Sequence, residues 1–134
     1  RRTSLMVLDT SAIVAVLLDE PERPAFTRWI EEDPRRLVSA ASRVEATFVI
    51  ESRKGEPGRE RLERFFRLTG AEVVAVTPEQ VEIACAAFRR YGKGRHPAGL
   101  NLGDVFAYAL AKVTGEPLLF KGDDFAKTDI VSAA

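Results

Sequence analysis

The sequence predicts an α/β domain with a mostly parallel central sheet. Short apolar runs of strand length recur along the chain, and longer segments with helical spacing of apolar residues separate them. Glycine and proline lie between these segments, as expected for turns. The chain has 134 residues, 46% of them hydrophobic, which suits one domain with its own core. We expect this domain to cover residues 6–134 and residues 1–5 to be a tag remnant or an upstream extension.

The first predicted element is a buried strand followed by a helix. Leu5–Leu8 is a short apolar run that ends at Asp9. The hydroxyls of Thr10 and Ser11 are suited to capping a helix over residues 12–18. Pro21 and Pro24 end that helix and allow a second one, which Asp33 and Pro34 terminate. The apolar face of the second helix consists of Phe26, Trp29 and Ile30.

The middle of the chain predicts a weak second strand and two helices. The strand covers residues 37–40, and a helix over 42–53 follows it. The side chains that we expect to face inward in this helix are Val44, Phe48 and Val49. Residues 55–58, with the sequence GEPG, form the clearest predicted turn. The next helix ends near Gly70 and has an apolar stripe of Leu62, Phe65 and Phe66.

The last third predicts two more strands and two more helices. Residues 73–76 form the third strand, and Thr77, Pro78 and Gln80 suit the N-cap, first and capping-box positions of a helix that runs to about residue 90. The expected buried face of this helix comprises Val81, Cys85 and Phe88. A polar loop, 91–99, leads to a helix over 102–113, and the fourth strand covers 118–120.

Acidic residues occupy positions that this topology brings to one edge of the sheet. Asp9 follows the first strand, and Asp123 and Asp124 follow the last. Glu45 and Asp104 each lie in the first turn of a predicted helix. The carboxyl ends of parallel strands form the ligand-binding edge of open α/β sheets. We therefore expect these carboxylates to meet in one pocket.

Clustered carboxylates indicate a metal-dependent reaction. They repel one another and resist joint ionisation unless a cation neutralises them. Oxygen ligands without histidine or cysteine partners favour Mg²⁺, with Mn²⁺ as a substitute. Such a site suits hydrolysis of a phosphodiester by metal-activated water. The sequence thus predicts a catalytic metal site that comprises Asp9, Glu45, Asp104 and one or both of Asp123 and Asp124.

Each acid also has a purely structural interpretation. Asp104 and Glu45 could complement helix dipoles, and Ser42 to Glu45 forms a complete capping box. Asp123 and Asp124 could belong to a turn with Gly122. Four acids at separate but geometrically compatible places favour a site over these alternatives.

The remaining composition indicates a soluble cytoplasmic protein without a membrane span. The apolar runs are far shorter than the roughly 20 residues that cross a bilayer. Cys85 is the only cysteine and is expected in the core, so no internal disulfide can form. The 20 basic and 20 acidic residues cancel, so bulk charge does not indicate nucleic-acid binding. Lys93, Arg95 and Lys121 are candidate contacts to the phosphate groups of a substrate, although Lys93 and Arg95 fit a plain solvated loop equally well, and His96 is most simply a solvated loop residue.

Four segments of the chain resemble PIN domains, and more narrowly the VapC toxins of bacterial toxin–antitoxin pairs. The matching segments are DTSA at 9–12, Glu45 at a helix start, NLGDVFAYALA at 101–111 and LLFKGDDF at 118–125. The resemblance extends from Met6 to about Ile130. It implies a three-layer PIN-like fold and a Mg²⁺-dependent endoribonuclease that cuts structured RNA such as tRNA or rRNA. It also implies a homodimer and a VapB-type antitoxin whose C-terminal arm covers the active site.

In the family pattern the four acids correspond to Asp9, Glu45, Asp104 and Asp124, the last being favoured over Asp123 because it directly precedes Phe125. Three other classes are alternatives. A phosphoreceiver-type signalling module needs a phosphoacceptor aspartate after the third strand, where this chain has Thr77 and Pro78. A non-catalytic interaction module would keep the fold with a degenerate site. A dehalogenase-type phosphatase needs a second aspartate at position 11, which is serine.

Overall fold

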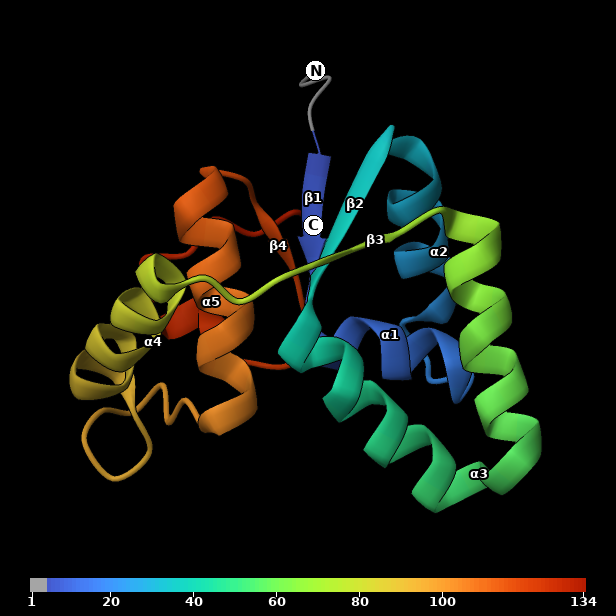
Figure 1. Cartoon of the computed structure of the whole chain (residues 1–134), viewed down its shortest axis with the longest axis horizontal. Helices are drawn as coiled ribbons and strands as arrows, with labels where there is room; N and C mark the ends of the chain where they lie inside the picture. Colours follow the sequence, from blue (N-terminus) through green and yellow to red (C-terminus); the bar gives the residue numbers. More distant parts are fainter. Residues whose placement is uncertain (1–4) are drawn as a thin grey trace.

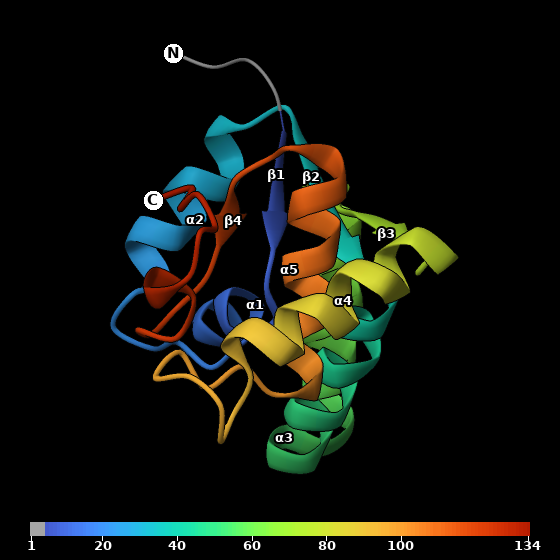
Figure 2. The same ribbon diagram turned by 90° about the vertical axis from the view of Figure 1, so that its left-hand side faces the viewer.

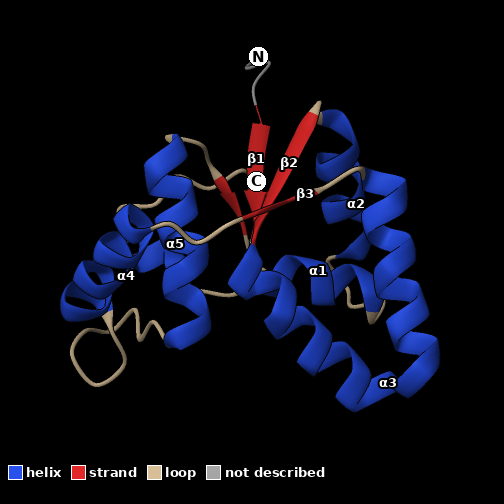
Figure 3. Cartoon of the chain, in the orientation of Figure 1, coloured by secondary structure: helices blue, strands red, loops and turns tan. Residues whose placement is uncertain are grey.

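A central sheet of four parallel strands organises the molecule. The computed structural model describes residues 5–134, and Figure 3 shows the strands between two groups of helices. The order across the sheet is β3-β2-β1-β4, and all three pairings are parallel. The strands are β1 (Leu5–Leu8), β2 (Arg35–Ser39), β3 (Glu72–Val74) and β4 (Leu118–Leu119). The predicted α/β class and parallel sheet are confirmed. Of the expected extension, residues 1–4 lie outside the described part, and Leu5 belongs to β1.

Helices cover both faces of the sheet and make a three-layer domain. In Figure 1 the first three helices lie on one side and the last two on the other, and Figure 2 shows α4 and α5 in front of the strands. The helices are α1 (Thr10–Leu17), α2 (Arg23–Glu32), α3 (Ala40–Thr69), α4 (Pro78–Tyr91) and α5 (Leu102–Thr114), and a 3-10 turn, η1, covers Phe125–Lys127. Within the described residues, none of these helices is long and apolar enough to span a membrane.

The central strand β1 is buried on both faces. Met6 and Leu8 point into the core shared with α1, α2 and α3. Val7 points into the opposite core, shared with α4 and α5. This alternation follows from the period of two in a strand. Asp9, which directly follows β1, therefore lies at the end of a strand that is buried on both faces.

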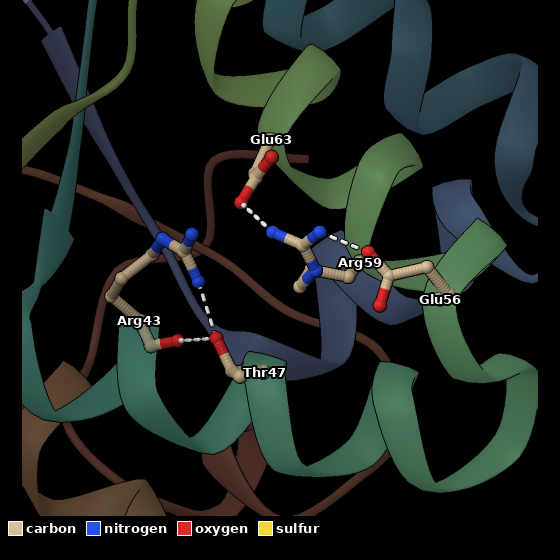
Figure 4. A network of polar contacts seen from close by, with 5 residues as sticks. All are labelled: Arg43, Thr47, Glu56, Arg59 and Glu63. Atoms are coloured by element: carbon tan, nitrogen blue, oxygen red, sulfur yellow. Dashed lines mark hydrogen bonds and ion pairs between the residues drawn. The ribbon is translucent and has the colours of Figure 1, made fainter.

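Helix α3 is two helical segments joined at a sharp bend. Gly55 has φ 59° and ψ −144°, and Pro57 is tolerated because it lies in the first turn of the second segment. The predicted turn at 55–58 is thus a bend at one residue. Figure 4 shows that Arg43 contacts Thr47 in the first segment, while Arg59 joins Glu56 and Glu63 in the second. The guanidinium of Arg43 also lies 4.7 Å from the centre of the Phe66 ring, which links the two segments.

The predicted start and buried face of α3 are wrong. The side chain of Ser39 accepts a hydrogen bond from the Ala41 amide, so the helix begins at residue 40 rather than at a cap on Ser42. Its buried residues in this segment are Ser42, Ala46 and Ile50. Val44 is 54% exposed and Phe48 is 69% exposed. Small side chains face α1 here because they allow the two helices to approach closely, which leaves the larger apolar residues on the outside.

Helix α4 shows the same departure from the expected pattern. Its predicted N-cap is confirmed, because the Thr77 hydroxyl accepts from the Gln80 amide. The Gln80 side chain donates to the carbonyl of Ala75. The predicted buried face is wrong, since Val81, Cys85 and Phe88 are all exposed. The residues that α4 buries are Gln80, Ala84, Ala87 and Tyr91. Alanines therefore form the contact with α5, and Cys85 lies on the surface rather than in the core.

Candidate active site

The predicted acidic residues come from four different elements at the carboxyl edge of the sheet. Asp9 follows β1 and is itself the N-cap of α1, a role that the sequence had indicated for Thr10 or Ser11. Asp104 is in the first turn of α5, and Glu45 is in the second turn of α3. Asp124 follows β4 and precedes η1. A hydrogen bond from the Thr10 hydroxyl to the Ser42 carbonyl, 3.3 Å long, ties α1 to the turn of α3 that carries Glu45.

Asp9 is a buried carboxyl group with one oxygen unpaired. Only 3% of the residue is exposed. Its Oδ2 accepts hydrogen bonds from the Ser11 amide at 3.0 Å and the Ser11 hydroxyl at 2.6 Å. Its Oδ1 is buried without a hydrogen-bond partner. Burial, together with the charges of Asp104 and Glu45, raises the pKa of Asp9 to about 7, against the opposing effect of the hydrogen bonds from Ser11. An unpaired buried oxygen of this kind is suited to a cation.

Asp104 combines a structural role with membership of the acidic cluster. It forms a capping box with Asn101, in which the Asn101 amide donates to Asp104 Oδ2 and the Asp104 amide donates to Asn101 Oδ1, both at 3.0 Å. Burial raises the pKa of Asp104, and the charges of Asp124 and Glu45 raise it too, while the bond to Asn101 lowers it. Asp104 therefore caps α5, a role beyond the predicted interaction with the helix dipole, and its carboxyl group is also electrostatically coupled to Asp9, Glu45 and Asp124.

Glu45 has no capping role in the structure. Because α3 begins at Ala40, Glu45 is one turn beyond the helix terminus, and the predicted box with Ser42 does not form. Its carboxylate instead lies against Gly103, in the first turn of α5. This position brings its charge close enough to raise the pKa values of both Asp9 and Asp104. The structural explanation that competed most strongly with a functional one is thereby removed.

The two acids that follow β4 differ in their relation to the cluster. Asp123 and Asp124 are both exposed, on the solvent side of the site. The charge of Asp124 raises the pKa of Asp104, and Asp123 is not among the groups that do so. The geometry therefore favours Asp124 as the fourth member, as in the family pattern, and leaves Asp123 at the rim.

The donor set fits a hard divalent cation. All four candidate ligands are carboxylates, which suit Mg²⁺ or Mn²⁺, and the unpaired Oδ1 of Asp9 lacks the partner that a cation would supply. Within residues 5–134, no three acidic, histidine or cysteine side chains already converge as a metal site. The carboxylates are coupled electrostatically without converging on one point. Mutual repulsion accounts for this spread arrangement.

Asp9→Asn should stabilise the metal-free protein at neutral pH but not at pH 4. Below about pH 4 the carboxyl group of Asp9 is protonated in both the folded and the unfolded chain, so its ionisation does not affect stability. Between pH 4 and 7 this group ionises in the unfolded chain but stays protonated in the folded one, which lowers the free energy of unfolding. Above pH 7 the penalty is constant, of the order of 4 kcal/mol. Urea unfolding in EDTA across this range measures the difference between variant and wild type. A difference that does not change with pH would contradict the buried ionisable Asp9.

The candidate RNA contacts have unequal surroundings. The Lys121 ammonium lies 3.1 Å from Glu20 Oε1 and 3.3 Å from Glu22 Oε1, so its charge is already paired. Lys93 and Arg95 are exposed in the loop between α4 and α5, and the Arg95 guanidinium lies 5.0 Å from the centre of the Phe88 ring. In Figure 1 this loop is at the end of the molecule where the strands terminate. Lys93 and Arg95 are therefore better placed than Lys121 to meet a polyanion.

His96 and Ser11 have structural roles near the site. The Nδ1 of His96 accepts a hydrogen bond from the Ala98 amide at 3.0 Å, and its ring packs edge-on against Tyr91. His96 therefore shapes its loop, rather than being simply solvated. The Ser11 hydroxyl accepts from the Lys121 amide at 2.9 Å while it donates to Asp9. Ser11 thus links the end of β1 to the end of β4. The sequence indicated Ser11 only as a possible helix cap and gave no signal of this link.

Comparisons with known proteins agree on one family. The family model described as "PIN domain" matches residues 6–131. Ribonuclease VapC30 of Mycobacterium tuberculosis is 53% identical over 129 residues, which cover 96% of this chain and 98% of that protein. A ribonuclease VapC of Mycolicibacterium smegmatis is 52% identical over 127 residues, covering 95% and 98%. Among solved structures, Mycobacterium tuberculosis VapC20, titled a sarcin–ricin loop cleaving toxin, matches with a TM-score of 0.77 at 19% identity, covering 94% of this chain and 96% of that one.

A second solved structure supports the same fold. It is VapBC2 from Rickettsia felis, bound to a DNA fragment from its promoter, and it matches with a TM-score of 0.74 at 11% identity, covering 96% of both chains.

Proposed function

Since the chain belongs to the PIN-domain family and to its VapC ribonucleases, we propose that it is a Mg²⁺-dependent endoribonuclease toxin whose active site comprises Asp9, Glu45, Asp104 and Asp124. One observation carries the assignment of the site. The buried carboxyl group of Asp9 has an unpaired oxygen and lies within the electrostatic field of Glu45 and Asp104. The N-cap role of Asp9 uses only Oδ2, and a stable fold gains nothing from the buried, unpaired Oδ1.

Some residues of the proposed site would bind the cation, and others hold these ligands in position. Asp9 and Asp104 are held in place by hydrogen bonds from Ser11 and Asn101, so they supply fixed carboxylates to the cation. Glu45 adds a third carboxylate from α3, and exposed Asp124 completes the set from the solvent side. When bound, Mg²⁺ would offset the charge of the phosphodiester and lower the pKa of a coordinated water.

Divalent-metal dependence is the direct test of this function. We expect the purified protein to cleave RNA internally in the presence of Mg²⁺ or Mn²⁺ and to stop when EDTA is added. Addition of excess Mg²⁺ after EDTA should restore cleavage, which distinguishes chelation from damage to the enzyme. Cleavage that survives exhaustive chelation would exclude a metal mechanism, and no cleavage under any metal would favour the non-catalytic interaction module.

We expect the substrate to be a structured RNA, such as a tRNA or a loop of rRNA. The acidic site lies near a loop with exposed Lys93 and Arg95, which suit phosphate groups on either side of a cleavage point. The VapC20 toxin, which shares the fold, is titled as cleaving the sarcin–ricin loop. The neutral net charge is consistent with a local basic contact rather than a basic surface over the whole molecule.

A VapB-type antitoxin is the proposed protein partner. Between α2 and the second segment of α3 is a groove of about 490 Å³, lined by apolar and arginine side chains together with Glu31. Its apolar residues are Val16, Leu17, Ile30, Phe65 and Leu68, and its arginines are Arg23, Arg36, Arg61 and Arg64. This combination suits an antitoxin arm with apolar anchors and acidic side chains.

We also propose a homodimer, which forms through the face of α3, α4 and α5. The early aromatic residues Phe26 and Trp29 pack on the core, so they do not supply the dimer surface. Val44 and Phe48 of α3, Val81 and Phe88 of α4 and Leu102 of α5 are exposed, and the last three line one groove of about 560 Å³. Exposed apolar groups gathered in this way are typical of protein interfaces. Sedimentation at micromolar concentration measures the oligomeric state directly.

A further inference from the structure

Gly103 occupies a position where its backbone conformation does not require glycine. It is the second residue of α5, and it is not among the glycines with positive φ. Glycine in a helix is less favourable than alanine because it loses more conformational entropy on folding. Neither helix propensity nor backbone conformation therefore explains why position 103 is glycine. The explanation lies in the groups that surround it.

The space beside Gly103 is filled by the carboxylate of Glu45. A Cβ atom at position 103 would lie 2.1 Å from Glu45 Oε2, 2.5 Å from its Cδ and 2.6 Å from its Oε1. These are the three nearest atoms that such a Cβ would meet outside its own helix backbone. All of them belong to the far end of a flexible side chain. A methyl group at this position would therefore displace Glu45 and leave α5 in place.

We propose that Gly103 is a positioning residue for Glu45, and that the absence of a side chain there admits the Glu45 carboxylate to the acidic cluster. This inference rests on the proposed metal site. Glu45 comes from α3, and the rest of the site comes from β1, α5 and the end of β4. Contact with the bare backbone of Gly103 is what brings the α3 carboxylate next to Asp104.

A double-mutant cycle between Gly103→Ala and Glu45→Ala tests the proposal. Mn²⁺ affinity is measured by calorimetry, cleavage by gel assay and stability by thermal unfolding in EDTA. We expect Gly103→Ala to weaken Mn²⁺ binding by about tenfold or more, as for groups that orient metal ligands, with an unchanged or higher Tm. In the Glu45→Ala background, which clears the space, adding Gly103→Ala should change Mn²⁺ affinity no further. The Glu45→Ala background is thus the matched control for any effect on the helix itself.

A crystal structure of metal-free Gly103→Ala provides a readout that does not depend on activity. It should show the Glu45 carboxylate displaced from α5, and an unmoved carboxylate would overturn the proposal. Wild-type Mn²⁺ affinity in Gly103→Ala, or an equal loss in both backgrounds, would overturn it as well. If Gly103→Ala fails to fold while the double variant folds, the clash with Glu45 is supported. A wild-type protein that neither binds Mn²⁺ nor cleaves RNA would refute the proposed function instead, and the crystal structure would still decide the positioning role.

Discussion

Asp104→Asn is expected to reduce RNA cleavage by about a thousandfold or more while the fold stays intact, a loss typical of removing one electrostatic group from an active site. The asparagine keeps an oxygen that can accept from the Asn101 amide, so the capping box that starts α5 survives. What disappears is a negative charge that lies within the field of Glu45 and Asp124. The melting temperature of the metal-free protein should rise slightly, because the substitution relieves burial and repulsion of that charge.

The measurement combines RNA cleavage in vitro with growth after expression in cells. The Asp104 variant should no longer arrest growth at an abundance equal to that of the wild type. Asp19→Asn is the matched control, because Asp19 is an exposed aspartate with φ 56°, a conformation that asparagine tolerates well. Growth arrest by the Asp104 variant at equal abundance would show that Asp104 is not part of the metal site.

The location of the site could be predicted from the sequence because parallel topology places the strand ends together. A carboxylate directly after the apolar run 5–8 is an unfavourable structural choice, and Asp9 is indeed buried with an unpaired oxygen. Strands alternating with helices indicated a parallel sheet, and the four strands are all parallel. These observations predicted that Asp9, Glu45, Asp104 and the two acids after the last strand lie at one edge of the sheet, and the family resemblance favoured Asp124 over Asp123.

The buried faces of α4 and of the first segment of α3 could not be predicted in the same way, although those of α2 (Phe26, Ile30) and of the second segment of α3 (Leu62, Phe65) agree with the prediction. Apolar periodicity identifies a stripe, but it does not distinguish a stripe that faces the core from one that stays on the surface. In α3 and α4 the stripes of larger apolar residues, such as Phe48 and Phe88, are exposed, and small residues such as Ala46 and Ala84 face inward. Close helix packing selects small residues, and an interaction surface retains large ones.

Contacts between distant residues also left no local signal. The glycine at position 103 looks unremarkable in a motif, and only the structure places Glu45, 58 positions earlier, against it. Lys121 follows the last strand and suggested a phosphate contact, but its ammonium is paired with Glu20 and Glu22. Pairing of this kind depends on where a loop from another element folds back, which spacing along the chain does not encode.

Glu45→Gln is expected to lower RNA cleavage by about a hundredfold or more without lowering stability. If Glu45 only capped α3, glutamine would replace it with little effect, because either side chain can reach a helix N-terminus. The structure assigns that cap to Ser39, so glutamine at position 45 does not disturb the start of the helix. It removes one charge that acts on Asp9 and Asp104 and one carboxylate available to the cation.

The decisive comparison is between cleavage and the melting temperature of the same Glu45→Gln protein. A large loss of cleavage with an equal or higher Tm in EDTA assigns Glu45 to the metal site, because relief of repulsion stabilises the metal-free fold. Ser39→Ala is the matched structural control, since loss of an N-cap should cost about 1 kcal/mol of stability and leave the carboxylates in place. Near-normal cleavage by Glu45→Gln would reduce the site to Asp9, Asp104 and Asp124. The contact between Glu45 and Gly103 would then have no role in the metal site.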